Sequence, residues 1–173
     1  MKYPLTLLLL VLLLSGPAYA DEPLRPPHLY TFCSSSGEFC ATSDPLKDST
    51  TVAAAASGEV LWSIPGWHRW LFIANDGQSL VVGYNGMNLV PLDISLEESV
   101  LSFYSRGKLM RQVALGDLYS SKSQLQRTVS HFAWAHIPGF NEHCELIVEL
   151  VDGRTVAFSG KNGQQVKVRA NGT

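Results

Sequence analysis

Short apolar runs broken by glycine-containing turns dominate the chain from residue 59 onward. Three of these breaks, at Asp76-Gly77, Arg106-Gly107 and Asp152-Gly153, lie between runs rich in β-branched and aromatic residues. Glycine and aspartate adopt the left-handed backbone conformations that tight hairpin turns need. We therefore predict three β-hairpins, followed by a last strand at 165–170, where polar and apolar residues alternate with period two.

Two segments before residue 59 lack this pattern. Residues 21–30 are rich in proline and predict an extended N-terminal arm. Residues 42–59 combine turn-forming residues with a run of alanines, and we expect a loop there that includes at most one helical turn.

One short helix is predicted at 116–129. Asp117 or Ser121 would cap its start, and Gln124 follows Ser121 at the spacing of a capping box. We expect this helix to connect two β-rich halves of the chain.

The two halves share a pattern that predicts an internal duplication. In each, a tryptophan precedes Ile-Pro-Gly and an aromatic residue, and an Asp-Gly turn and an Asn-Gly turn follow in the same order. A repeated unit of this kind buries its apolar face against its neighbour. The first copy contains Trp62, Ile64-Pro65-Gly66-Trp67, Asp76-Gly77 and Asn85-Gly86, and the second contains Trp134, Ile137-Pro138-Gly139-Phe140, Asp152-Gly153 and Asn162-Gly163.

These patterns predict an all-β fold, a sandwich or distorted barrel of about ten short antiparallel strands built on the two tandem repeats. The chain is too short for a closed β-propeller, which needs at least about four blades. A fragment that completes a propeller-like ring by oligomerising is the minority alternative. We expect residues 21–58, the arm and a cysteine hairpin, to pack with the duplicated domain at 59–173 as one compact unit.

The first 20 residues have the layout of a secretory signal peptide. Lys2 precedes an apolar run from Leu7 to Leu14, and Ala18-Tyr19-Ala20 forms an A-x-A cleavage site. The run is shorter than the roughly 20 residues of a transmembrane helix. We expect cleavage before Asp21, a secreted or periplasmic protein, and no transmembrane segment in the mature chain.

The cysteines fit an oxidising compartment. Cys33 and Cys40 flank a turn-rich hexapeptide, so a hairpin centred on Ser36-Gly37 would place them opposite one another, within reach of a disulfide. Cys144 is left over. We expect a buried, inert thiol there, with pairing to another chain or competition for Cys33 as the alternatives.

Composition narrows the function classes. The chain has 13 basic and 15 acidic side chains, a formal net charge of −2, and no run of basic residues, so nucleic acid is a poor candidate partner. The sequence contains no Gly-x-Ser-x-Gly nucleophile elbow, zinc-ligand spacing or calcium loop. We predict neither a metal nor a cofactor, and no catalytic residue.

The aromatic loops after the two Pro-Gly breaks are the candidate binding surface, because binding residues concentrate on loops held by rigid strands. We expect an exported, non-enzymatic binding or structural protein of the bacterial envelope or extracellular space, with a protein partner favoured over carbohydrate. The alternatives are a small secreted enzyme or enzyme inhibitor and a stabilising subunit of a larger assembly. The candidate binding residues are Trp67, His68, Trp70, Phe140 and His143.

Overall fold

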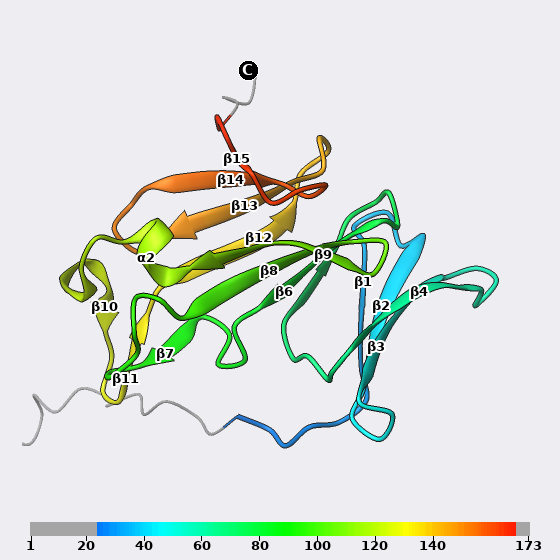
Figure 1. The fold of residues 1–173 in the computed structure, drawn as a ribbon, viewed down its shortest axis with the longest axis horizontal. Helices are drawn as coiled ribbons and strands as arrows, with labels where there is room; N and C mark the ends of the chain where they lie inside the picture. The colour runs from blue at the N-terminus through cyan, green and yellow to red at the C-terminus, as the bar shows by residue number, and fades with distance from the viewer. Residues whose placement is uncertain (1–23, 169–173) are drawn as a thin grey trace, which may run out of the picture.

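The structure, a computed structural model, describes residues 24–168 and is all-β apart from two helical turns (Figure 1). The predicted signal peptide at 1–20 and its cleavage before Asp21 lie outside the described residues. Within residues 24–168, no helix is long and apolar enough to cross a membrane.

Three four-stranded antiparallel sheets follow one another along the chain. The first sheet contains β1 (Tyr30–Cys33), β2 (Phe39–Asp44), β3 (Ser49–Ala54) and β4 (Val60–Pro65). The second sheet contains β5 (Leu71–Ile73), β6 (Ser79–Gly83), β8 (Ser99–Ser105) and β9 (Lys108–Ala114). The third sheet contains β12 (Ala135–Phe140), β13 (Glu145–Leu150), β14 (Thr155–Ser159) and β15 (Gln165–Val166).

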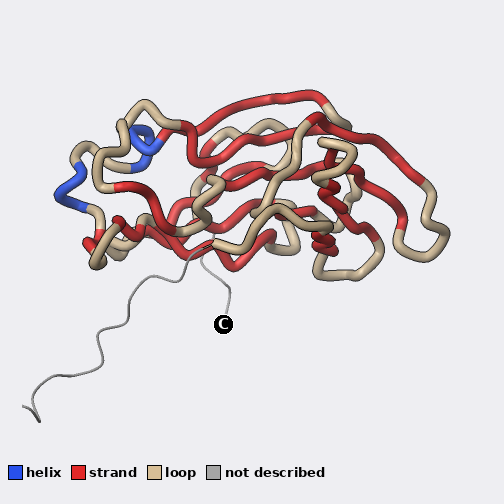
Figure 2. The backbone as a smooth tube through the Cα atoms, turned by 90° about the horizontal axis from the view of Figure 1, so that it is seen from below, coloured by secondary structure: helices blue, strands red, loops and turns tan. Residues whose placement is uncertain are grey.

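A small sheet takes one strand from the β6–β8 connection of the second sheet and two from the segment between the second and third sheets, which also contains the two helical turns. The small sheet is formed by β7 (Leu89–Pro91), β10 (Gln126–Arg127) and β11 (His131–Ala133), and the turns are α2 (Leu115–Leu118) and the 3-10 turn η1 (Lys122–Gln124). Seen from a second direction, both helical turns lie at one end of the elongated molecule (Figure 2).

The second sheet is the middle layer of the stack. Alternation along β5 divides its side chains between two cores, since Leu71 and Ile73 pack toward the first sheet while Phe72 packs toward the third. Every residue of β6 is buried. β5 also contacts β1 and β2 of the first sheet and β12 of the third.

The two cores differ in size. The smaller core joins the first and second sheets and is built from Ala41, Val52, Ile64, Leu71, Ile73, Leu80 and Val82. The larger core lies among the second, third and small sheets, and its largest fully buried side chains include Trp134, Tyr119, Phe103 and Phe158. The described residues thus form four antiparallel sheets, with the second sheet between the two cores and no closed barrel.

The predicted hairpins are confirmed. β5 and β6 pair across Asp76-Gly77, β8 and β9 across Arg106-Gly107, and β13 and β14 across Asp152-Gly153. Both central residues of the second turn have positive φ, 48° for Arg106 and 82° for Gly107, as a tight hairpin turn requires. Of the predicted last strand, β15 covers Gln165–Val166 among the described residues, and positions 169–170 lie outside them.

The loop prediction for 42–59 is wrong. β2 extends to Asp44, and β3 occupies Ser49–Ala54 in the middle of this range and pairs with both β2 and β4. Thr50 and Val52 are buried while their neighbours are half-buried, and Val52 packs in the smaller core. The run of alanines is misleading because small residues also fit in a half-buried strand. The first sheet also includes β4, so it crosses the boundary expected between residues 58 and 59.

The helix prediction for 116–129 is only partly right. The capping box of Ser121 and Gln124 forms, but it caps the 3-10 turn η1 rather than a continuing α-helix. The chain leaves the helical conformation at Leu125, which is buried in the larger core, and then enters β10. Burial of Leu125 against the sheets prevails over local helix propensity.

The two copies of the predicted repeat occupy different positions in their sheets. Asp76-Gly77 joins the first and second strands of the second sheet, whereas Asp152-Gly153 joins the second and third strands of the third sheet. Trp62 lies in the last strand of its sheet, and Trp134 immediately precedes the first strand of another. The matched residues are therefore not structurally equivalent.

Candidate functional site

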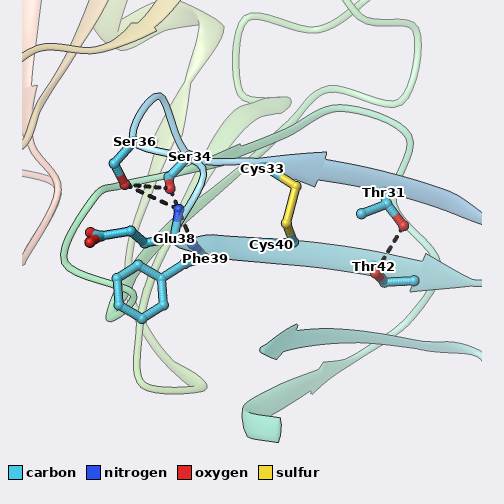
Figure 3. The surroundings of a disulfide bond; sticks show 8 residues. All are labelled: Thr31, Cys33, Ser34, Ser36, Glu38, Phe39, Cys40 and Thr42. Carbon is cyan, nitrogen blue, oxygen red and sulfur yellow. Dashed lines mark hydrogen bonds between the residues drawn. A yellow bond between two sulfur atoms is a disulfide. The ribbon is translucent and has the colours of Figure 1, made fainter. Parts of the chain in front are cut away.

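A disulfide between Cys33 and Cys40 closes the β1–β2 hairpin, as predicted (Figure 3). The two cysteines are direct cross-strand partners. Beyond them, the turn is held by the backbone N–H of Ser34, which donates to the carbonyl oxygen of Phe39 over 2.8 Å, and by a contact of 3.1 Å between the hydroxyls of Ser34 and Ser36. The hairpin tip is thus fixed both covalently and by hydrogen bonds.

The Asn75–Gly77 turn at the tip of β5 and β6 is bonded to the other two large sheets. The side-chain oxygen of Asn75 accepts hydrogen bonds from the backbone N–H of Ser36 over 2.9 Å and the hydroxyl of Ser35 over 3.0 Å. The carbonyl oxygen of Gly77 accepts one from the indole of Trp62 over 2.9 Å. These bonds fasten the second sheet to the first.

Cys144 connects the same turn to the third sheet. Its Sγ lies 3.5 Å from Asp76 Oδ2 and 3.7 Å from Ser79 Oγ, and it is a free thiol. Burial raises the pKa of the Cys144 thiol to about 11, despite the opposing effect of its hydrogen bond with Ser79. Although burial acts against it, hydrogen bonds from Gln78 and Ser79 hold the pKa of Asp76 below its ordinary value. This thiol is protonated at neutral pH and is a poor nucleophile as placed.

Phe140 lines a small cavity where β1, β5 and β12 meet. The cavity has a volume of about 120 Å³, well below the roughly 300 Å³ of a typical ligand pocket. Its walls are Phe32, Cys33, Ser35, Phe72, Ile73, Pro138, Gly139 and Phe140. It is better explained as a packing gap between three sheets than as a binding site.

A groove of about 340 Å³ borders the Asn75–Gly77 turn, between Leu61 and Arg106. Its polar groups are already engaged inside the protein. Arg106 donates from Nε to Gln78 over 3.1 Å, and the Trp62 indole is bonded to Gly77. Few of its hydrogen-bonding groups remain for a ligand.

In the pocket around Trp67, by contrast, charged side chains remain for a ligand. It has a volume of about 320 Å³ and is lined by two arginines, one histidine and several apolar or aromatic side chains. We call it the Trp67 pocket; its lining residues are Leu24, Arg25, His28, Tyr30, Trp67, Arg69 and Met87. It is large enough for a small ligand or one or two side chains of a partner.

Backbone geometry and hydrogen bonds place Trp67 in this pocket. Gly66, at φ +90°, turns the chain out of β4, a conformation that side chains rarely adopt. The Trp67 backbone N–H then donates to Asp48 Oδ1 over 3.2 Å, and its indole donates to the carbonyl oxygen of His28 over 2.8 Å. The second bond holds the N-terminal arm against the tryptophan and forms one wall of the pocket.

His68 and Trp70 are candidate binding residues that the structure places in supporting roles. The His68 backbone N–H donates to the buried Ser43 hydroxyl over 2.6 Å, and its ring Nε2 lies 3.1 Å from the Pro65 carbonyl oxygen. Burial lowers the pKa of His68, against the opposing contact with the Pro65 carbonyl. Trp70 packs against the larger core, with its ring centroid 5.3 Å from that of Phe72 and 5.9 Å from that of Trp134.

The two aromatic loops do not form one surface. Trp67 lies before the start of β5, whereas Phe140 shares a cavity with Ile73 at the end of β5. His143 lies near Phe140, exposed, with its Nε2 3.6 Å from Glu142. Trp67 and Phe140 therefore line two different cavities, and whether either binds a partner stays a prediction.

The sequence reasoning missed most of the Trp67 pocket. Arg25, His28 and Tyr30 belong to the segment that was expected to be a simple extended arm, and Met87 lies in the β6–β7 connection. Arg69 stands two residues after Trp67, and its guanidinium lies over the Trp67 ring, 5.0 Å from the centroid. The available signal was the combination of Arg, His and Tyr in the arm with an aromatic-basic loop.

The chain shows no match to any protein-family model or to any curated protein. Within residues 24–168, no group of three or more histidine, cysteine, aspartate or glutamate side chains is placed to hold a metal ion.

Proposed function

We propose that this protein is an exported, non-enzymatic binding domain that holds a segment of a partner protein in the Trp67 pocket. The observation that carries the proposal is the pocket itself, about 320 Å³ in volume and walled by aromatic, apolar and basic side chains. Sites with this mixture of apolar walls and a few charged groups are typical of ligand recognition.

The lining favours a protein segment over a carbohydrate. Sugar hydroxyls are usually bound by carboxylate and amide side chains, and neither type is among the residues that line the pocket. The Trp67 indole N–H is already bonded to His28, and Arg69 lies over its ring. Less of the tryptophan is left to stack on a sugar.

The alternative of an enzyme would need an activated acid, base or nucleophile. The strongest such cluster combines Cys144, Asp76 and Ser79, but burial keeps this thiol protonated and Asp76 is bonded within its own turn. The contacts of Cys144 with Asp76 and Ser79 join two sheets. We therefore look for the binding site elsewhere on the molecule.

Export is part of the proposal. It rests on the signal-like first 20 residues and is supported by the Cys33–Cys40 disulfide, since disulfides persist in oxidising compartments.

Affinity capture tests the proposal. The protein purified after export of the full-length chain is immobilised and exposed to envelope extract and culture medium, alongside its Trp67→Ala and Phe140→Ala variants. We expect a partner that the native protein and the Phe140→Ala variant retain and the Trp67→Ala variant loses. Phe140 is the matched control because it is an aromatic residue of the other Pro-Gly loop and lies outside the pocket.

Thermal melting of all three proteins establishes that the variants are folded. Equal capture by the folded Trp67→Ala variant would overturn the proposed site.

A further inference from the structure

The Trp67 pocket has a marked excess of positive charge. Arg25 and Arg69 both line it, together with His28, and no aspartate or glutamate is among its lining residues. In the part of the chain that the structure describes, neither arginine forms a salt bridge. Two guanidinium groups around one cavity, with no salt bridge to another described residue, favour an anionic ligand.

Arg69 has hydrogen-bonding capacity that the protein does not use. Its Nε is buried and, among residues 24–168, has no hydrogen-bond partner. A buried donor without a partner is uncommon and needs an explanation, because leaving it unbonded costs free energy. The guanidinium is held in place by the ring of Trp67, 5.0 Å away. A positioned arginine of this kind suits a planar acceptor with two oxygens.

We infer that the Trp67 pocket recognises a carboxylate of a peptide segment together with an adjacent apolar side chain, an inference that rests on the function proposed above. The carboxylate would bind the guanidinium groups of Arg25 and Arg69, since arginine and carboxylate pair through two parallel hydrogen bonds. The apolar neighbour would pack against Leu24, Trp67 and Met87. The carboxylate can come from an aspartate or glutamate side chain or from a peptide C-terminus.

Selection from peptide libraries tests this inference without a known partner. The exported full-length product is used to select binders from two random-peptide libraries, one with free C-termini and one with the peptide enclosed between flanking sequence. We expect binders in which a carboxylate lies beside a large apolar residue. Their appearance in both libraries indicates a side-chain carboxylate, and their restriction to the first library indicates a C-terminus.

The charge contribution is then measured on selected peptides. Replacing the carboxylate by the amide, Glu→Gln, Asp→Asn or an amidated C-terminus, should weaken binding about tenfold, the loss expected for a charge-assisted hydrogen bond. Arg69→Gln and Arg25→Gln should each weaken it to a similar extent. Arg127→Gln is the matched control, because Arg127 is an exposed arginine outside the pocket.

If Arg69→Gln impairs folding, Arg25→Gln still tests the inference, because Arg25 lies in the exposed arm outside every sheet and its replacement should not affect folding. Binders that require Trp67 but show no preference for a carboxylate would overturn the inference and leave the proposed function standing. Failure to select any binder that Trp67→Ala abolishes would overturn both.

Discussion

The indole of Trp62 donates a hydrogen bond to the carbonyl oxygen of Gly77 over 2.9 Å, and this contact joins the last strand of the first sheet to the first turn of the second. The ring of Phe39 presses on the same glycine from β2, so that a Cβ added at Gly77 would lie 2.5 Å from Phe39 Cδ1. The turn is therefore confined from two sides, and its glycine is required both by conformation and by space.

Gly77→Ala should destabilise the protein much more than Gly153→Ala. Both glycines follow an aspartate in a hairpin turn and have positive φ, 63° and 89°, but a Cβ at Gly153 would meet nothing within 4 Å. Gly153→Ala should cost only the strain of a left-handed alanine, about 1–2 kcal/mol, and Gly77→Ala about 1–3 kcal/mol more because the Phe39 ring must move.

Urea unfolding of the two variants and the native protein measures this difference. Equal midpoints for the two variants would show that Phe39 gives way without cost.

Trp134→Ala should lower stability by about 3–5 kcal/mol, the usual cost of removing a large buried aromatic side chain. Trp134 is fully buried, its indole donates to the carbonyl oxygen of Met87 over 2.9 Å, and its own carbonyl accepts a hydrogen bond from Tyr119. Trp67→Ala should leave the melting temperature nearly unchanged, because Trp67 is half-buried at the surface pocket. Differential scanning calorimetry of both variants measures the two losses of stability. A larger loss for Trp67→Ala than for Trp134→Ala would contradict the placement of Trp134 in the core and Trp67 at the surface.

Cys144 should react slowly with iodoacetamide in the folded protein. Burial raises the pKa of its thiol from 9.0 to about 11, so at about pH 8 the reactive thiolate is roughly a hundredfold scarcer than in the unfolded chain. The alkylation rate should keep rising with pH beyond 9.0, whereas the rate in urea should level off near the ordinary thiol pKa. Equal rates in the folded and unfolded protein would contradict this placement of Cys144.

The same shift has a consequence for stability. Because the unfolded chain releases the Cys144 proton at a lower pH than the folded protein, the contribution of this group to folding stability is constant below about pH 9.0 and falls as the pH rises toward 11. Cys144→Ser should remove that part of the alkaline loss.

Features set by neighbouring residues were predictable from the sequence. In the turns at Asp76-Gly77 and Arg106-Gly107, residues Gly77, Arg106 and Gly107 adopt positive φ. The Cys33–Cys40 disulfide forms because the hairpin between the two cysteines is short. The capping box of Ser121 and Gln124 also depends only on a spacing of three residues.

Features set by tertiary contacts were not predictable. The strand β3 is stabilised by the burial of Val52 in the smaller core and by the hydrogen bond of Thr50 to Ser43, and nothing in a stretch of small residues reveals these contacts. The Trp67 pocket needs Arg25 and Tyr30 of the arm to lie beside Met87 from a distant connection. Trp67 itself was identified, since a Pro-Gly break before an aromatic residue is a local signal.

The order in which the three large sheets stack is also their order in the sequence. Each sheet is a continuous piece of chain, apart from β7 and its flanking loops, so its strands pair with near neighbours and need only short loops to close. A chain that emerges from its N-terminus can therefore complete the first sheet by residue 65 and cover its apolar face with the very next strands, β5 and β6. The third sheet, which comes last in the sequence, then covers the other face of the second sheet. Such an arrangement suits vectorial folding, in which each layer is built on the one finished before it.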